Sequence, residues 1–133
     1  MVIFFDGDTR KGSNRILTYG LFMDSPLGRV GMTETQASAS ERKATAAQKP
    51  MSHISRAKEK GETLWFMKFL EDADSKEFLG AAVLGVEGDE LIHAVTDIMY
   101  AKAPYTVIQW AVHIHPTVSE LVPSTLGELA PLE

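Results

Sequence analysis

Apolar and aromatic residues form two runs in the middle of the chain, ETLWFMKFL at 62–70 and EFLGAAVLGV at 77–86, with the polar stretch EDADSK between them. Runs of this length and composition are typical of strands, so the pattern predicts an antiparallel hairpin with a polar turn. Asp72 and Asp74 have the spacing of the first two ligands of a calcium loop, but Glu77 occupies the position of its glycine. We therefore predict a turn and not a cation site.

A helical pattern follows at 89–102, DELIHAVTDIMYAK, where apolar residues recur on one stripe and two acidic residues stand in the first turn. The preceding GVEGDE has neither the glycine spacing of a dinucleotide loop nor a Walker lysine, so it is interpreted as a corner between strand and helix. His93 falls beside Asp97 on the polar face, which favours a solvated histidine over a ligand.

The stretch 28–40, GRVGMTETQASAS, predicts a short strand near Val30 and Met32. Thr33 and Gln36 then have capping-box spacing, which predicts the start of a helix. By propensity alone, the alanine-rich KATAAQKPM at 43–51 is a weak helix candidate.

Two further helix starts are expected at hydroxyl residues, with Ser52 capping a helix that runs to about Lys60 and Thr106 capping a short turn over 107–111. The mixed order of strands and helices predicts an α+β fold, a sandwich of a mostly antiparallel sheet with helices.

Composition limits the function classes. The 133 residues fit one domain, and a net charge of −5 argues against nucleic acid as a partner. No apolar run approaches the ~20 residues that cross a bilayer, and the start MVIFFDGDTRKGSNR lacks a signal-peptide core, so we expect a cytoplasmic protein without a membrane partner. The absence of cysteine excludes disulfides, thiolate metal sites and thiol chemistry carried by this chain itself.

The stretch AVHIHPTVSELVPSTLGEL at 111–129 holds the candidate chemistry. If residues 111–115 are extended, His113 and His115 project to the same side, and a further ligand would complete a metal site. The remaining histidines, His53 and His93, have no diagnostic spacing, so a metal site is the minority interpretation.

Two other interpretations concern Glu120. Thr117-x-x-Glu120 has capping-box spacing, which would start a helix after Pro116, and Pro123 would then kink or restart that helix. Alternatively Glu120 turns toward His115, holds the imidazole in one tautomer and stabilises its protonated form. Periodicity does not choose between them.

Three blocks in order, YGLFMDSPLGRVGMTETQA, RAKEKGETLWFMKFLEDADSKEFLGAAVLG and HIHPTVSEL, resemble the carboxy-terminal dimerisation domain of the flavin-dependent pyridine nucleotide-disulfide oxidoreductases. That family includes dihydrolipoamide dehydrogenase, glutathione reductase and mercuric reductase, and the sequence is most similar to mercuric-reductase-like bacterial enzymes. The resemblance covers nearly all of residues 18–130. It implies that residues 18–133 are the dimerisation domain, that 1–17 are a remnant of a preceding FAD-binding domain, and that 43–51 is a strand.

The resemblance also implies a homodimer in which this domain closes the active site of the other subunit. FAD and NAD(P)H would bind in other domains of the same protein, and none is expected to bind this fragment alone. The matched positions give His115 as the acid-base residue, Glu120 as the group that orients it, and Pro116, with His115, as a neighbour of the partner subunit's FAD. A role in cell redox homeostasis would follow. The fragment alone would be inactive.

One departure from the family concerns the carboxy terminus, where mercuric reductases carry a cysteine pair and this chain ends GELAPLE, so mercury is a doubtful substrate. Trp65 and Trp110 are larger than expected at their positions and are assigned to packing or interface contact. The alternative function is a stand-alone, non-catalytic homodimeric interaction module, with a His-x-His metal contact as an option.

Overall fold

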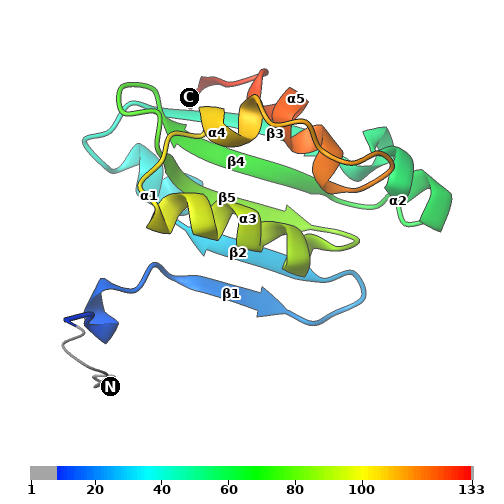
Figure 1. The fold of residues 1–133 in the computed structure, drawn as a ribbon, viewed down its shortest axis with the longest axis horizontal. Helices are drawn as coiled ribbons and strands as arrows, with labels where there is room; N and C mark the ends of the chain where they lie inside the picture. Colours follow the sequence, from blue (N-terminus) through cyan, green and yellow to red (C-terminus); the bar gives the residue numbers. More distant parts are fainter. Residues whose placement is uncertain (1–8, 133) are drawn as a thin grey trace.

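The structure is a computed structural model that describes residues 9–132, so residues 1–8 of the expected FAD-domain remnant lie outside the described part. Its centre is a six-stranded sheet in the order β1-β2-β5-β4-β3-β6, in which neighbouring strands are antiparallel (Figure 1). The strands are β1 (Thr18–Leu21), β2 (Leu27–Gly31), β3 (Ala44–Pro50), β4 (Phe66–Asp72), β5 (Phe78–Leu84) and β6 (Ala130–Pro131).

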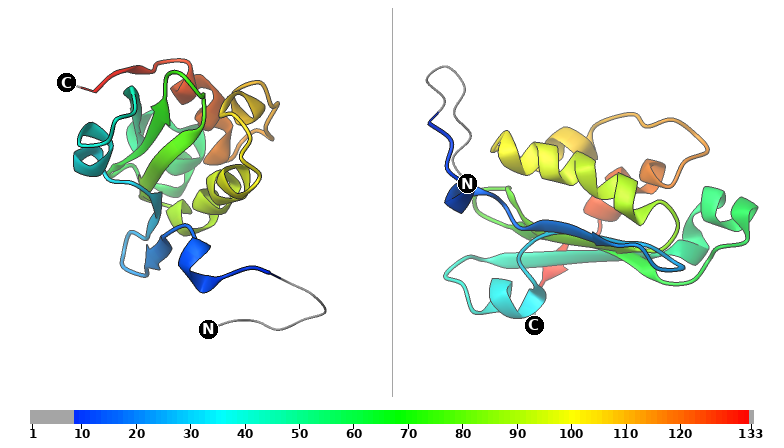
Figure 2. Two further views of the ribbon diagram at one scale, coloured as in Figure 1. Left: turned by 90° about the vertical axis from the view of Figure 1, so that its left-hand side faces the viewer. Right: turned by 90° about the horizontal axis from the view of Figure 1, so that it is seen from below.

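Helices cover the sheet unequally. Figure 2 shows α3 and α4 on one face and the short α1 on the other. This arrangement confirms the predicted α+β fold. The helices are α1 (Glu34–Ser38), α2 (Ser55–Lys60), α3 (Gly88–Tyr100), α4 (Thr106–Gln109) and α5 (Val122–Leu126), with 3-10 turns η1 (Gly12–Asn14), η2 (Met51–His53) and η3 (Ser119–Leu121).

The main core lies between the sheet and α3, α4 and α5. Met67, Phe69 and Val83 of the central strands are fully buried there against Leu91 and Val95 of α3. Val118, Val122 and Leu126, near the carboxy terminus, belong to the same core. A smaller cluster on the opposite face packs Ala37 of α1 against Leu70 and Leu79.

The predicted hairpin is confirmed as β4 and β5. Its turn is built on the Asp72 carboxylate, which accepts hydrogen bonds from the Asp74 amide, the Ser75 hydroxyl and Arg42. Burial opposes ionisation of this carboxyl, but the three donors stabilise the charge, and the pKa of Asp72 is lowered. Asp72 is therefore a turn residue.

Strand β3 shows tertiary context overriding local propensity, as the family resemblance implied. It pairs with β4 along its whole length, from Ala44 opposite Asp72 to Pro50 opposite Phe66. Ala47, opposite Phe69 of β4, is 4% exposed. The helix interpretation of 43–51 is wrong because pairing partners on both sides, β4 and β6, outweigh the helix propensity of alanine.

Helix starts were predicted with mixed success. The capping box of α1 is confirmed, with Thr33 accepting from the Gln36 amide and the Gln36 side chain accepting from the Thr33 amide. Ser52 instead lies inside η2, and α2 begins after Ile54 without a side-chain cap. Thr106 is the first residue of α4 and not its cap. The sequence spacing predicted that these helices exist. The direction from which the chain enters each helix decides which residue caps it.

Candidate functional site

The candidate site lies on the loop of residues 111–118, which leads from α4 into η3 and α5. This loop, drawn in orange, extends to the same end of the molecule as α2 (Figures 1 and 2). Val118 and Val122 anchor its far side in the main core, with exposed fractions of 1% and 2%. The loop is therefore an exposed segment held at its base by packed residues.

His115 and Glu120 are joined by a hydrogen bond of 2.7 Å between Nδ1 and Oε2. The imidazole is 72% exposed, whereas the carboxylate side chain is only 11% exposed. Because an ionised carboxylate can only accept, Nδ1 carries the proton and donates it. The second nitrogen, Nε2, has no partner among residues 9–132 and is free to accept or release a proton.

The capping-box interpretation of Thr117 and Glu120 is wrong. The Thr117 hydroxyl donates to the carbonyl of Ile114, and η3 begins after Val118 without a side-chain cap. The Glu120 carboxylate that would complete the box instead binds His115. Pro123 lies in the first turn of α5, which confirms the expected helix restart.

His113 and His115 each use one ring nitrogen in a hydrogen bond. The Nδ1 atom of His113 bonds the carbonyl oxygen of Ser119 at 2.8 Å, and Nδ1 of His115 is bonded to Glu120. Within the described residues, no three His, Asp or Glu side chains are grouped so that they could hold a metal ion. His93 is exposed on α3, as predicted, and His53 is exposed in η2. The His-x-His metal contact is therefore not favoured.

Four exposed apolar side chains precede His115 in the chain, and we call them the 107–114 patch. It consists of Val107, Trp110, Val112 and Ile114, which are 51%, 79%, 99% and 79% exposed. Trp110 therefore does not pack in the core, which leaves interface contact as its expected role. The later stretch LVPSTLGEL adds little to this surface, because Val122 and Leu126 are buried in the chain's own core.

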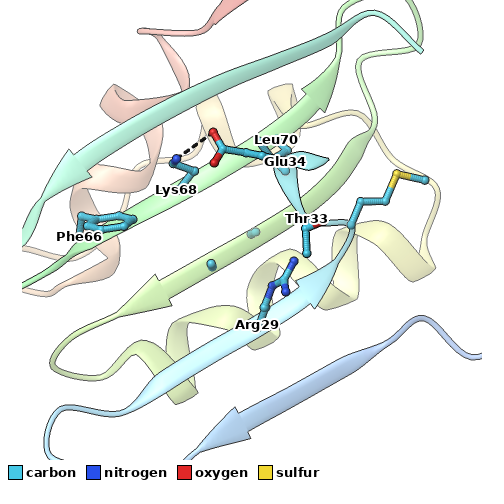
Figure 3. Close-up of a pocket in the computed structure, with 9 residues that line it drawn as sticks. Arg29, Thr33, Glu34, Phe66, Lys68 and Leu70 are labelled. Carbon is cyan, nitrogen blue, oxygen red and sulfur yellow. Dashed lines mark ion pairs between the residues drawn. The ribbon is translucent and has the colours of Figure 1, made fainter. Parts of the chain in front are cut away.

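A separate hollow of about 250 Å³ lies over the sheet face that carries α1 (Figure 3). Its lining includes Arg29, Phe66 and Lys68, and the Lys68 ammonium is paired with Glu34 at 2.9 Å. None of the site residues predicted from the sequence lines it. The ion pair balances the charge of Lys68, and Arg29 donates to the hydroxyl of Tyr19.

Sequence reasoning missed Glu71, a fully buried glutamate at the end of β4. Neither carboxylate oxygen has a hydrogen-bond partner within the described part of the chain. Burial raises the pKa of Glu71 to about 8, so the carboxyl is largely protonated at neutral pH. Its position in the polar stretch EDADSK gave no signal of burial.

The comparisons with known proteins agree with one another. The family model "Pyridine nucleotide-disulphide oxidoreductase, dimerisation domain" matches residues 18–125. The chain is 33% identical over 115 residues to the probable pyridine nucleotide-disulfide oxidoreductase RclA of Escherichia coli, covering 86% of this chain and 26% of RclA. It is 31% identical to dihydrolipoyl dehydrogenase 2 of Haloarcula marismortui, covering 87% and 25%. The chain thus spans about a quarter of these relatives.

Solved structures agree. The HOCl-induced flavoprotein disulfide reductase RclA from Escherichia coli superposes with a TM-score of 0.87 at 32% identity, over 92% of this chain and 28% of that chain. LpdA from Mycobacterium tuberculosis superposes with a TM-score of 0.76 at 16% identity, over 82% and 24%, which is a likeness of fold alone. None of the helices that the structure describes is long and apolar enough to cross a membrane.

Proposed function

The chain belongs to the pyridine nucleotide-disulphide oxidoreductases, as a dimerisation domain of that family, and on that premise we propose that it completes the active site of a partner subunit in an FAD-dependent NAD(P)H oxidoreductase. His115 is the acid-base group in this proposal, and Glu120 orients it. A dimerisation domain implies a homodimer, so each subunit would lend its histidine to the other.

The hydrogen bond between His115 and Glu120 carries this proposal. It holds one imidazole nitrogen and leaves Nε2 free on a side chain that is 72% exposed. In thiol-disulfide exchange a thiol must lose its proton before the sulfur attacks, and the leaving thiolate must regain one. His115 Nε2 would take the first proton and return it to the leaving sulfur. General acid-base help of this kind is worth ~10²–10⁴ in rate.

Glu120 would act through His115 and not on the substrate. Its side chain is 11% exposed, so its oxygens are shielded from solvent while Oε2 accepts the Nδ1 proton. A carboxylate in this position fixes the tautomer that leaves Nε2 unprotonated, and it stabilises the imidazolium that forms when Nε2 takes a proton.

The cofactors would be held mainly outside this chain. The loop around His115 and Pro116 is exposed, with Val112 99% exposed, and none of the hollows found in residues 9–132 is lined by this loop. FAD, when bound in the other domains of the protein, supplies electron transfer between the nicotinamide nucleotide and the disulfide. In this proposal His115 and the exposed Pro116 would lie near the partner subunit's FAD.

The 107–114 patch is the proposed site of subunit contact next to the histidine. Exposed apolar side chains are common singly, but Val107, Trp110, Val112 and Ile114 are gathered within eight residues. Aromatic residues such as Trp110 dominate the energetics of protein interfaces. Burying this patch against a second subunit would place His115 at the border of the interface.

A domain exchange tests the function. Residues 18–132 replace the corresponding dimerisation domain of Escherichia coli RclA, and NAD(P)H oxidation is measured with bound FAD quantified by absorbance. We expect an active dimer whose turnover falls ~10²-fold or more with His115→Gln, with FAD retained. His93→Gln is the matched control, since His93 is exposed on α3. An active exchange protein that is indifferent to His115→Gln would refute the catalytic role.

A further inference from the structure

The loop that carries the proposed catalytic pair is closed by a second histidine. His113 Nδ1 lies 2.8 Å from the carbonyl oxygen of Ser119, the residue immediately before Glu120. The imidazole of His113 is half-buried, unlike that of His115. His115 in turn bonds Glu120. Between these two histidine contacts, the Thr117 hydroxyl donates to the Ile114 carbonyl at 2.7 Å. Three side-chain bonds therefore tie residues 113–115 to residues 117–120.

The direction of the His113 bond follows from its acceptor. A carbonyl oxygen can only accept, so Nδ1 of His113 must carry the proton. Both the neutral Nδ1–H tautomer and the imidazolium satisfy this condition. The bond is therefore compatible with both protonation states of His113.

We propose that His113 is a positioning residue, whose imidazole holds the backbone before Glu120 so that the Glu120 carboxylate meets Nδ1 of His115. Glu120 lies in η3, a turn of only three residues without a side-chain cap. Such a turn does not by itself fix the direction of its side chains. The His113 bond supplies the missing restraint one residue away. Its catalytic meaning rests on the proposed function, but its effect on the loop does not.

Two substitutions distinguish the effect of the His113 hydrogen bond from the effect of the bulk of its ring. In His113→Asn the amide Nδ2–H can reach the Ser119 carbonyl from the place of Nδ1, whereas His113→Leu keeps bulk and removes the donor. The readout is the tautomer of His115, taken from ¹⁵N chemical shifts of its ring in this chain. We expect a dominant Nδ1–H tautomer in the wild type and in His113→Asn. In His113→Leu that dominance should be lost, because Glu120 is no longer held in place.

A control and a second measurement keep the test decisive. His93→Leu, on the exposed face of α3, should leave the His115 ring signals unchanged. Should His113→Leu fail to fold, the wild type alone suffices: the Nδ1–H proton of His113 should give a signal protected from exchange with water. An unchanged His115 tautomer in folded His113→Leu, or the absence of that protected proton, overturns the proposal.

Failure of this inference is distinguishable from failure of the proposed function. In the domain exchange with RclA, His113→Leu should lower turnover about tenfold while KM and FAD content stay near wild type, and His113→Asn should restore most of it. A His115 tautomer that responds to His113 in an exchange protein indifferent to His115→Gln would keep the positioning role and refute the catalytic one.

Discussion

Glu71 is the residue whose environment differs most from its usual one. Its side chain is fully buried, neither oxygen has a partner among residues 9–132, and its pKa is raised from 4.5 to about 8 by desolvation. A raised carboxyl pKa means that the folded state keeps a proton which the unfolded state releases above about pH 4.5. Stability is then fully present below that pH and is lost as the pH rises toward 8.

The first prediction is therefore a stability that falls with pH. Between pH 5 and 8 the free energy of unfolding should decrease by several kcal/mol, with roughly 5 kcal/mol as the upper limit set by the shift. Glu71→Gln cannot ionise and should be the more stable protein at pH 8. Urea unfolding at both pH values measures this. Exposed Glu62→Gln is the control, and a wild-type stability that does not fall by pH 8 would contradict the prediction.

The second prediction separates charge from hydrogen bonding at Glu120. Glu120→Gln keeps an acceptor for His115 Nδ1 but removes the negative charge, so the Nδ1–H tautomer should persist. Turnover of the exchange protein should still fall ~10-fold or more, because the imidazolium loses its counter-charge. Glu120→Leu should lose the tautomer as well. Full turnover in Glu120→Gln would show that the charge has no role.

The candidate pair could be predicted from the sequence only in part. Thr117-x-x-Glu120 and His115-x4-Glu120 compete for the same carboxylate, and spacing alone does not reveal the path of the loop. Family resemblance selected the His115 partner, and the structure has that hydrogen bond. Glu71 was not predictable, because it lies in a polar stretch of the sequence and at a register shift in the pairing of β4 with β5, which local spacing does not reveal.

At the scale of elements, the close approach of α3 to β2 is controlled by glycine. A Cβ atom on Gly28 would lie 2.1 Å from the carbonyl oxygen of Gly88, the first residue of α3. The contacted carbonyl group belongs to the backbone of Gly88, so a larger residue at position 28 would have to push the helix away from the sheet.

The third prediction concerns this contact. Gly28→Ala should destabilise the fold by ~2–3 kcal/mol, since neither the strand nor the helix start can move without disturbing packed neighbours. Gly20→Ala is the matched control in neighbouring β1, where the nearest atom to an added Cβ is 3.4 Å away. Thermal or urea unfolding of both variants measures the difference. Equal stability of the two would show that α3 can shift without cost.

Elements with strong periodicity were the predictable ones. The hairpin of β4 and β5 follows from two continuous apolar runs in which consecutive residues are buried, and the helix α3 follows from an apolar stripe that is buried on one face. Strand β3 did not follow from its alanines, because its partners β4 and β6 are distant in sequence. Caps at Ser52 and Thr106 failed for a similar reason, since the chain enters each helix from a turn that local spacing does not specify.

At the scale of the whole molecule, the fourth prediction concerns self-association. The chain should form a dimer through a surface that includes the 107–114 patch, and sedimentation equilibrium should show it. Trp110→Glu should shift the equilibrium toward monomer, because a charge would be buried where an indole packed. Leu64→Glu is the control, as Leu64 is 70% exposed and lies outside the patch. A wild type that stays monomeric at high concentration would contradict the prediction.

The position of some core residues late in the chain has a consequence for folding during synthesis. The side chains of Val118, Val122 and Leu126 are at most 2% exposed, yet these residues follow β1 to β5 in the chain. A nascent chain that has released β5 and α3 still lacks this part of the core, and with it Thr125, whose hydroxyl contacts the sulfur of Met67. Stable folding must therefore wait until residues 118–126 have left the ribosome, and polypeptides that terminate before them should be substrates for chaperones and proteases.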